Sequence, residues 1–139
     1  MTPIETVLKF FNAMQMRDFD TALALVTEDV VYDNKPLATL HGRRRFNQFL
    51  RPWVEMHDDI SILVSNIVAS GEMVIVERID RDRKGAGPWI STQAAGFFRV
   101  RDGQIAEWRD YYDLNTSCLQ NGGDYFEYVK LAQSVADAP

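Results

Sequence analysis

Consecutive strand patterns fill the second half of the sequence, and they constrain the fold more than any other feature. Runs rich in β-branched and aromatic residues predict four strands after Asp59, at 60–69, 72–80, 89–100 and 104–113. The dipeptides at 70–71 (SG) and 102–103 (DG) are typical of tight turns between paired strands. The order predicts an antiparallel meander, which needs other elements to cover its buried face.

Helical patterns precede these strands and can supply that cover. Thr2 to Glu5 has the form of a capping box with proline at the first helical position, so a helix should run from about 3 to 15. A second, short helix should follow, and then a strand at 29–34. A third helix should begin near 43, and Pro52 should kink or end it.

These elements predict one α+β domain that spans residues 1–139. The sheet should be curved and mixed, mainly antiparallel, because Gly96 interrupts a strand interior where a bend or bulge is typical. Helices packed on its concave side would form a cone with an internal pocket. Beyond Asn115 we expect one or two helical turns around 125–132 and a flexible tail after about 134.

The charge balance argues against a nucleic acid or an anionic membrane as the main partner. The chain has 15 Lys+Arg against 20 Asp+Glu, a net charge of −5. No apolar run approaches the roughly 20 residues of a membrane span, and the first residues lack the basic region of a signal peptide. A cytoplasmic location is therefore expected.

Few residues suggest a metal or a cofactor. Cys118 is the only cysteine, so it has no partner for an internal disulfide. His41 and His57 stand alone in the sequence, without a second His or Cys at metal-binding spacing. We expect both histidines to be surface groups, and we expect no metal and no cofactor.

Three predicted strands each carry a polar or large pair separated by two positions. The pairs are Tyr32 with Asn34, Arg78 with Asp80, and Trp108 with Asp110. Alternate residues of a strand face the same side, so the members of each pair point together. Each pair alone is typical of a wet face, a surface salt bridge or a strand end, but three such pairs suggest that all of them line one cavity.

The turn at Asp102 allows a test of register. A two-residue turn pairs Arg101 with Gln104, and a regular ladder then places Asp110 opposite Ala95. The next hairpin would bring Arg78 near Ala95 too, so a small residue would separate the guanidinium from Asp110. A bulge at Gly96 would shift this register.

The expected line of Asp80, Arg78 and Asp110 has a chemical use. Two neighbouring acids push their pKa values apart, so that one keeps a proton while the other stays ionised. One can then serve as a general acid and the other as a general base. Arg78 would orient both, and Tyr32 and Asn34 would supply polar atoms that hold a water molecule.

Three segments, taken in order, resemble the limonene-1,2-epoxide hydrolase family: YDNKPL at 32–37, ERID at 77–80 and EWRDYYD at 107–113. The resemblance in element order covers roughly residues 3–118. It implies a cone in the nuclear-transport-factor-2-like fold, a homodimer, and hydrolysis of an epoxide to a vicinal diol in one step without a cofactor.

The resemblance also implies roles for individual residues. Asp80 matches the acid that protonates the epoxide oxygen, and Asp110 matches the base that takes a proton from water. Tyr32 and Asn34 match residues that hold this water, and Arg78 matches the bridge between the carboxylates. The expected wall residues of the substrate pocket are Trp108 and Tyr112.

Two other functions fit the same predicted fold. An isomerase or a polyketide cyclase would use one Asp as base, with no need for a second carboxylate or for Arg78. A ligand-binding module without catalysis would need neither carboxylate. The polar stretch after Asp80 departs from the family pattern, and Asp82 shares the face of Asp80 if the strand continues that far.

Overall fold

The computed structural model describes residues 1–120 and 125–139 of the chain. The helices of this part are α1 (Pro3–Gln15), α2 (Phe19–Ala24), α3 (Arg43–Met56), α4 (Leu114–Gln120) and α5 (Tyr125–Asp137). The strands are β1 (Val26–Lys35), β2 (Leu40–His41), β3 (Asp59–Ser70), β4 (Met73–Arg83), β5 (Ile90–Arg101) and β6 (Gln104–Tyr112).

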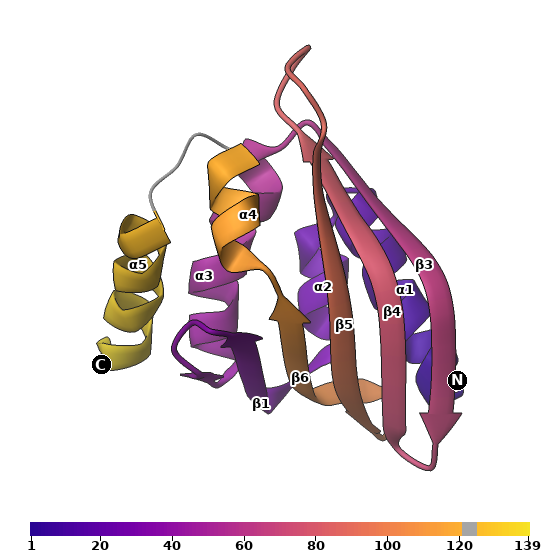
Figure 1. The fold of residues 1–139 in the computed structure, drawn as a ribbon. Coiled ribbons are helices and arrows are strands. Elements are labelled where there is room, and N and C mark those ends of the chain that lie inside the picture. The colour runs from indigo at the N-terminus through magenta and orange to yellow at the C-terminus, as the bar shows by residue number, and fades with distance from the viewer. Residues whose placement is uncertain (121–124) are drawn as a thin grey trace.

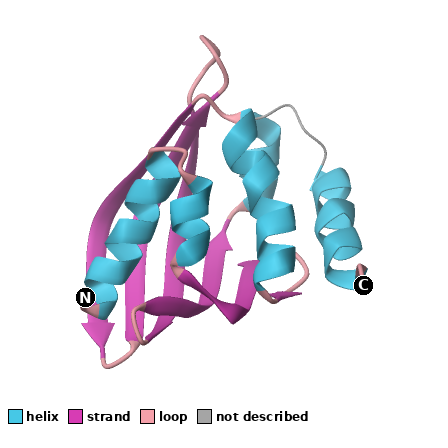
Figure 2. Ribbon diagram, turned by 180° about the vertical axis from the view of Figure 1, so that it is seen from behind, coloured by secondary structure: helices cyan, strands magenta, loops and turns pink. Residues whose placement is uncertain are grey.

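All of these strands belong to one sheet with the order β2-β1-β6-β5-β4-β3. β1 runs parallel to β6, and every other neighbouring pair is antiparallel. The sheet curves, and the helices lie together on one side of it (Figures 1 and 2). The predicted α+β cone, with a mixed and mainly antiparallel sheet, is confirmed.

Helix α1 begins where the sequence predicted. The Thr2 hydroxyl accepts a hydrogen bond from the Glu5 backbone N–H at 3.1 Å, and the Glu5 carboxylate accepts one from the Thr2 N–H at 2.8 Å. This capping box satisfies two backbone donors that the first helical turn leaves free. The buried face of α1 then packs against the sheet through Val7, Phe10 and Phe11.

The sequence predicted that Pro52 would kink or end helix α3. The helix instead continues past Pro52 to Met56. Proline removes one backbone donor and costs a helix interior about 3 kcal/mol. Buried apolar side chains lie on both sides of it, with Phe49 and Leu50 before and Val54 after. Each fully buried side chain of this kind contributes about 1.5–3 kcal/mol, so packing against the core outweighs the loss.

The register between β5 and β6 differs from the expected one by one residue. Arg101 pairs with Gln104 as predicted, and Asp102 and Gly103 adopt φ values of 52° and 76°, as a tight turn requires. The ladder then shifts between Arg99 and Val100, instead of at Gly96. Trp108 consequently pairs with Phe98, and Asp110 pairs with Gly96 instead of Ala95.

The C-terminal region contains more helix than the sequence predicted. Asp113 precedes α4, and its carboxylate accepts a hydrogen bond from the Thr116 N–H at 3.0 Å, which satisfies a free donor of the first turn. α5 continues past Ser134 to Asp137, and its buried residues Ala132 and Val135 explain why the helix extends there. The expected tail therefore begins later than 134.

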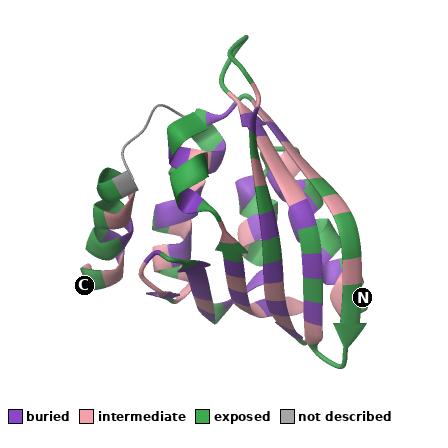
Figure 3. Cartoon of the chain, in the orientation of Figure 1, coloured by how far each residue is buried: buried purple, intermediate pink, exposed green. Residues whose placement is uncertain are grey.

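Burial alternates along the strands (Figure 3), which fixes the face of each side chain. On β4, Val74, Val76 and Arg78 are buried, whereas Ile75 and Glu77 are exposed. The buried positions face the helices and the exposed ones face outward. No helix in residues 1–120 and 125–139 is both long and apolar enough to cross a membrane.

Candidate active site

A cavity of about 630 Å³ lies between the concave face of the sheet and the helices. α1 and α3 contribute aromatic walls, among them Phe10, Phe49 and Trp53. The strands contribute polar groups, and every residue of the three predicted pairs lines this cavity: Tyr32, Asn34, Arg78, Asp80, Trp108 and Asp110. An apolar cavity with a few convergent polar groups is typical of a small-molecule site.

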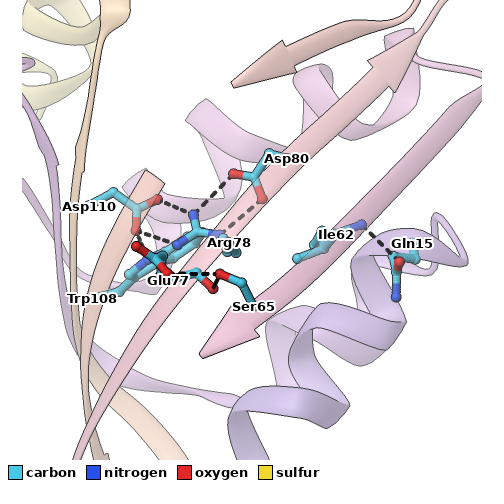
Figure 4. Close-up of polar contacts among 8 residues, drawn as sticks. All are labelled: Gln15, Ile62, Ser65, Glu77, Arg78, Asp80, Trp108 and Asp110. Carbon is cyan, nitrogen blue, oxygen red and sulfur yellow. Dashed lines mark hydrogen bonds and ion pairs between the residues drawn. The ribbon is translucent and has the colours of Figure 1, made fainter. Parts of the chain in front are cut away.

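Arg78 lies at the centre of the polar groups, between two carboxylates (Figure 4). Its Nε and Nη2 donate to Asp80 at 2.9 and 3.1 Å. Its Nη1 and Nη2 donate to Asp110 at 3.1 and 2.6 Å. A planar guanidinium suits two such paired contacts at once. The predicted line of Asp80, Arg78 and Asp110 therefore exists in the structure.

Gly96 provides the space in which Arg78 reaches Asp110. Arg78 pairs with Ala94 on the strand between them, whereas Asp110 pairs with Gly96, so the contact runs diagonally over the glycine. A Cβ atom at Gly96 would lie 2.7 Å from Arg78 Nη1 and 2.7 Å from Asp110 Oδ1. The sequence correctly predicted a small residue at this point but identified it as Ala95, because the ladder shift was not foreseen.

Trp108 has a polar role that the sequence did not reveal. Its indole Nε1–H donates to Asp110 Oδ1 at 2.7 Å, within the same strand. The ring also stacks on Phe98, with centroids 5.3 Å apart and planes at 17°. Asp110 therefore receives hydrogen bonds from both Trp108 and Arg78, which fix its orientation. The spacing of two positions between Trp108 and Asp110 was the signal that could have predicted this bond.

The two carboxylates differ in exposure and electrostatics. The side chain of Asp80 is 28% exposed, whereas that of Asp110 is 7% exposed. Burial raises the pKa of Asp80, the Arg78 guanidinium opposes this rise, and the negative charge of Asp110 adds to it, so that the pKa stays above its ordinary value. Asp80 is thus the more accessible carboxyl, and its surroundings favour a proton on it.

β1 brings Tyr32 and Asn34 beside this cluster. In the parallel ladder, Tyr32 pairs with Trp108 and Asn34 pairs with Asp110. The Asn34 Nδ2 donates to the Tyr112 hydroxyl at 3.0 Å, so the amide oxygen of Asn34 stays available as an acceptor. Burial raises the pKa of Tyr32 far above its ordinary value, so that its hydroxyl keeps its proton. Tyr112 lines the cavity, as expected.

The expectation that His57 is a surface group is wrong. His57 is 2% exposed, and its Nε2 lies 3.0 Å from Asp82 Oδ1. Because α3 continues past Pro52, His57 follows the helix end and contacts β4, on which Asp82 faces inward. Both residues line the cavity. The opposite charges offset the cost of burying each of them alone, and nothing in the local sequence around His57 signals this pairing.

His57, Asp80, Asp82 and Asp110 line the cavity, but they are not arranged as one metal site. Among residues 1–120 and 125–139, no three His, Cys, Asp or Glu side chains are placed to hold one metal ion together.

Comparisons with a family model and with a related protein point to the same family. The model of the limonene-1,2-epoxide hydrolase catalytic domain matches residues 1–121. The chain is 36% identical over 106 residues to the epoxide hydrolase EphG of Mycobacterium tuberculosis. This alignment covers 76% of this chain and 69% of that protein.

Solved structures agree with this match. An epoxide hydrolase from M. tuberculosis, described as like limonene-1,2-epoxide hydrolase, superposes with a TM-score of 0.71 at 31% identity, over 95% of this chain and 92% of that one. A Catenulispora acidiphila protein with a ketosteroid isomerase-like fold superposes with a TM-score of 0.74 at 22% identity, over 88% and 95%. The second likeness shows a shared fold alone.

Proposed function

The chain belongs to the limonene-1,2-epoxide hydrolase family, and from this membership we propose that it converts a small-molecule epoxide to a vicinal diol by a single attack of water. The observation that carries the proposal is Arg78 bound to both Asp80 and Asp110 on the cavity wall. The enzyme is a cofactor-independent hydrolase of this type, and its substrates are an epoxide and water.

Asp80 acts as the general acid. Its carboxyl is the more accessible of the two and has a raised pKa, so it carries the proton that the epoxide oxygen needs. Protonation of that oxygen assists cleavage of the C–O bond, because the leaving alkoxide becomes a hydroxyl group. Arg78 holds Asp80 through two hydrogen bonds and keeps it oriented toward the cavity.

Asp110 acts as the general base toward the attacking water. The water oxygen forms a bond to an oxirane carbon while one of its protons passes to Asp110, and the C–O bond of the ring breaks in the same step. Asn34 pairs with Asp110 and Tyr32 with Trp108, both on the cavity wall, and the Asn34 amide oxygen and the Tyr32 hydroxyl hold the water in place. The product carries two hydroxyl groups, one from the water and one from the epoxide.

The two carboxylates favour hydrolysis over the other chemistries of this fold. An isomerase or a polyketide cyclase requires one base, and a binding module requires no carboxylate at all. The hydrogen bonds from Arg78 to both acids, in a cavity large enough for a small molecule, support a reaction that needs an acid and a base together.

A single turnover in water enriched in oxygen-18, with enzyme in excess, tests the mechanism. Direct attack puts the label into the diol during this first turnover and leaves the protein unlabelled. The alternative route uses an Asp as nucleophile and forms an ester that water then cleaves. An unlabelled first diol, with label in Asp80 or Asp110, would show that ester and disprove the one-step reaction.

The pH dependence of kcat/KM should follow the protonation state of Asp80. Asp80 must be protonated, and its raised pKa extends the protonated range above the ordinary value, so activity should fall as pH rises through that pKa. The residual activity of Asp80→Asn should lack the alkaline decline, and the same decline in that variant would contradict the assignment.

The outer face of the sheet supports the expected homodimer. Apolar side chains exposed there include Leu63, Val68, Ile75 and Tyr111, and apolar patches on a sheet face commonly mark contacts between copies of a chain. Sedimentation equilibrium of the purified chain measures this, and a monomer at all concentrations would contradict it. The cytoplasmic location stays a prediction.

A further inference from the structure

The proposed reaction leaves one polar pair on the cavity wall without a role, namely His57 with Asp82. Both are nearly inaccessible, at 2% and 6% exposure. The His57 Nε2 lies 3.0 Å from Asp82 Oδ1, and its Nδ1 lies 2.7 Å from the Trp53 carbonyl oxygen. A buried ion pair is weak evidence for stability, because removing two charges from water offsets most of their attraction. The pair therefore calls for another explanation.

Asp82 lies on the same face of β4 as the proposed acid, one step farther along the strand. Asp80 pairs with Thr92 and Asp82 pairs with Ile90 across the neighbouring strand. Two residues of a strand span about 7 Å, so the two carboxyl groups are separated by roughly that distance. Ile60 pairs with Asp82 on the other side, so Asp82 lies between two isoleucines in the sheet.

The contacts of His57 determine what Asp82 can offer to a ligand. Because Nδ1 faces a carbonyl oxygen, it must donate, and Nε2 then shares its proton with Asp82. Burial lowers the pKa of His57, but the hydrogen bonds to Asp82 and to the Trp53 carbonyl outweigh this effect and raise it. Within residues 1–120 and 125–139, His57 is the one hydrogen-bond partner of Asp82, through Oδ1, so Oδ2 retains its capacity to accept.

We propose that Asp82, oriented by His57, accepts a hydrogen bond from a hydroxyl group of the substrate, so that the preferred substrates are epoxy alcohols. This deepens the proposed function and rests on it. The hydroxyl would lie about 7 Å from the oxirane oxygen, as Asp82 lies from Asp80. The aromatic walls of the cavity, such as Phe49 and Trp53, would contact the apolar carbons between the two groups.

A neutral hydroxyl suits this position better than a cationic group. With Nδ1 against a carbonyl oxygen and Nε2 against the carboxylate, the His57 ring donates from both nitrogens, and its positive charge already balances that of Asp82. A substrate ammonium would meet that positive charge within a few ångströms in a buried site, where like charges repel strongly. A hydroxyl donates one hydrogen bond and brings no charge. A substrate without any donor would leave the Asp82 oxygen desolvated and unpaired.

Matched substrates test this inference. In 5,6-epoxyhexan-1-ol the hydroxyl reaches about 7 Å from the oxirane oxygen, which matches the separation of Asp80 and Asp82. The compound 1,2-epoxyhexane has no hydroxyl. In 3,4-epoxybutan-1-ol the hydroxyl lies too close to the oxirane to reach Asp82. We expect wild-type enzyme to prefer the hexanol in kcat/KM over both others. Asp82→Leu should lower the ratio of hexanol to epoxyhexane about tenfold or more, the value of a hydrogen bond to a charged group.

Controls separate specificity from folding. A structural role of Asp82 would lower the activity on all three epoxides equally and leave their ratios unchanged. Asp59→Asn changes an exposed carboxylate on β3 that pairs with Arg83, and should leave the ratios unchanged. If Asp82→Leu does not fold, Asp82→Ala, which also lacks an acceptor, replaces it, and the substrate preference of the wild-type enzyme is an independent measurement.

The outcomes distinguish this inference from the proposed function. Diols from all three epoxides without a preference for the hexanol, or with ratios that Asp82→Leu or Asp82→Ala leaves unchanged, would overturn the inference and leave the hydrolase assignment intact. The absence of diol from every epoxide, in folded enzyme, would overturn the proposed function together with the inference that rests on it.

Discussion

Asp80→Asn and Asp110→Asn should each lower turnover by at least ~100-fold, the usual scale for losing a general acid or base. Asparagine has nearly the shape of aspartate, but it carries no acidic proton and cannot take one from water. Both changes leave a side-chain oxygen that can accept a hydrogen bond from Arg78. The contact with the guanidinium is therefore weakened, but the substitution leaves no empty space in the core. Steady-state rates of diol formation measure the effect.

The matched control is Glu77→Gln, one residue before Arg78 on β4. Glu77 is exposed and points outward, where its carboxylate accepts from Ser65 and Asn66. This change removes a carboxylate from the same strand but from the opposite face, and activity should stay near that of the wild type. Near-normal turnover in Asp80→Asn or in Asp110→Asn, with the protein folded by circular dichroism, would contradict the role of that residue.

The double variant Asp80→Asn with Asp110→Asn should be little worse than the slower of the two single variants. Acid and base act in one step, and the effects of residues that act as a unit are strongly non-additive. Losses that multiply instead would indicate that the two residues act in separate steps.

Gly96→Ala should reduce kcat/KM by about 100-fold, through displacement of both charged partners. The new methyl group would lie 2.7 Å from Arg78 Nη1 and from Asp110 Oδ1, closer than real contacts allow. Both side chains are almost completely buried, at 2% and 7% exposure, so neither can move aside into solvent. The protein should also lose about 1–3 kcal/mol of unfolding free energy, as is typical of overpacked interiors.

Urea denaturation and diol formation measure the two effects of Gly96→Ala. The control is Ala95→Ser at the next position of β5, which is exposed on the outer face and adds one atom where there is room. It should change neither quantity. Wild-type activity in Gly96→Ala would show that the diagonal contact between Arg78 and Asp110 tolerates a wider separation than the structure indicates.

Local signals predicted the groups of the site, because alternation along a strand needs no knowledge of distant parts of the chain. Arg78 and Asp80 share a face whatever the register, and so do Trp108 and Asp110. The capping box at Thr2 likewise fixed the start of α1 from four residues.

Properties that depend on more than one segment were harder to predict. One unpaired residue in β6 changes the pairing partner of Asp110 from the predicted Ala95 to Gly96, because a slip of one position changes every later pairing. The burial of His57 depends on whether α3 continues beyond Pro52, and packing decides this more than helix propensity does. α4 and the full length of α5 are stabilised by buried residues such as Cys118 and Val135, whose contacts the local pattern does not show.

The parallel contact between β1 and β6 has a kinetic consequence. It joins segments that are distant along the chain, since Asn34 and Tyr112 lie 78 positions apart, whereas the hairpins of the meander join near neighbours. Closing so long a loop costs more conformational entropy than forming a local hairpin, and it is therefore slower. A chain that has folded only its meander already holds Asp80, Arg78 and Asp110, but not the residues that place the water. Enzyme activity therefore reports on a contact of high sequence separation, and a folding intermediate with the charged cluster complete would still be inactive.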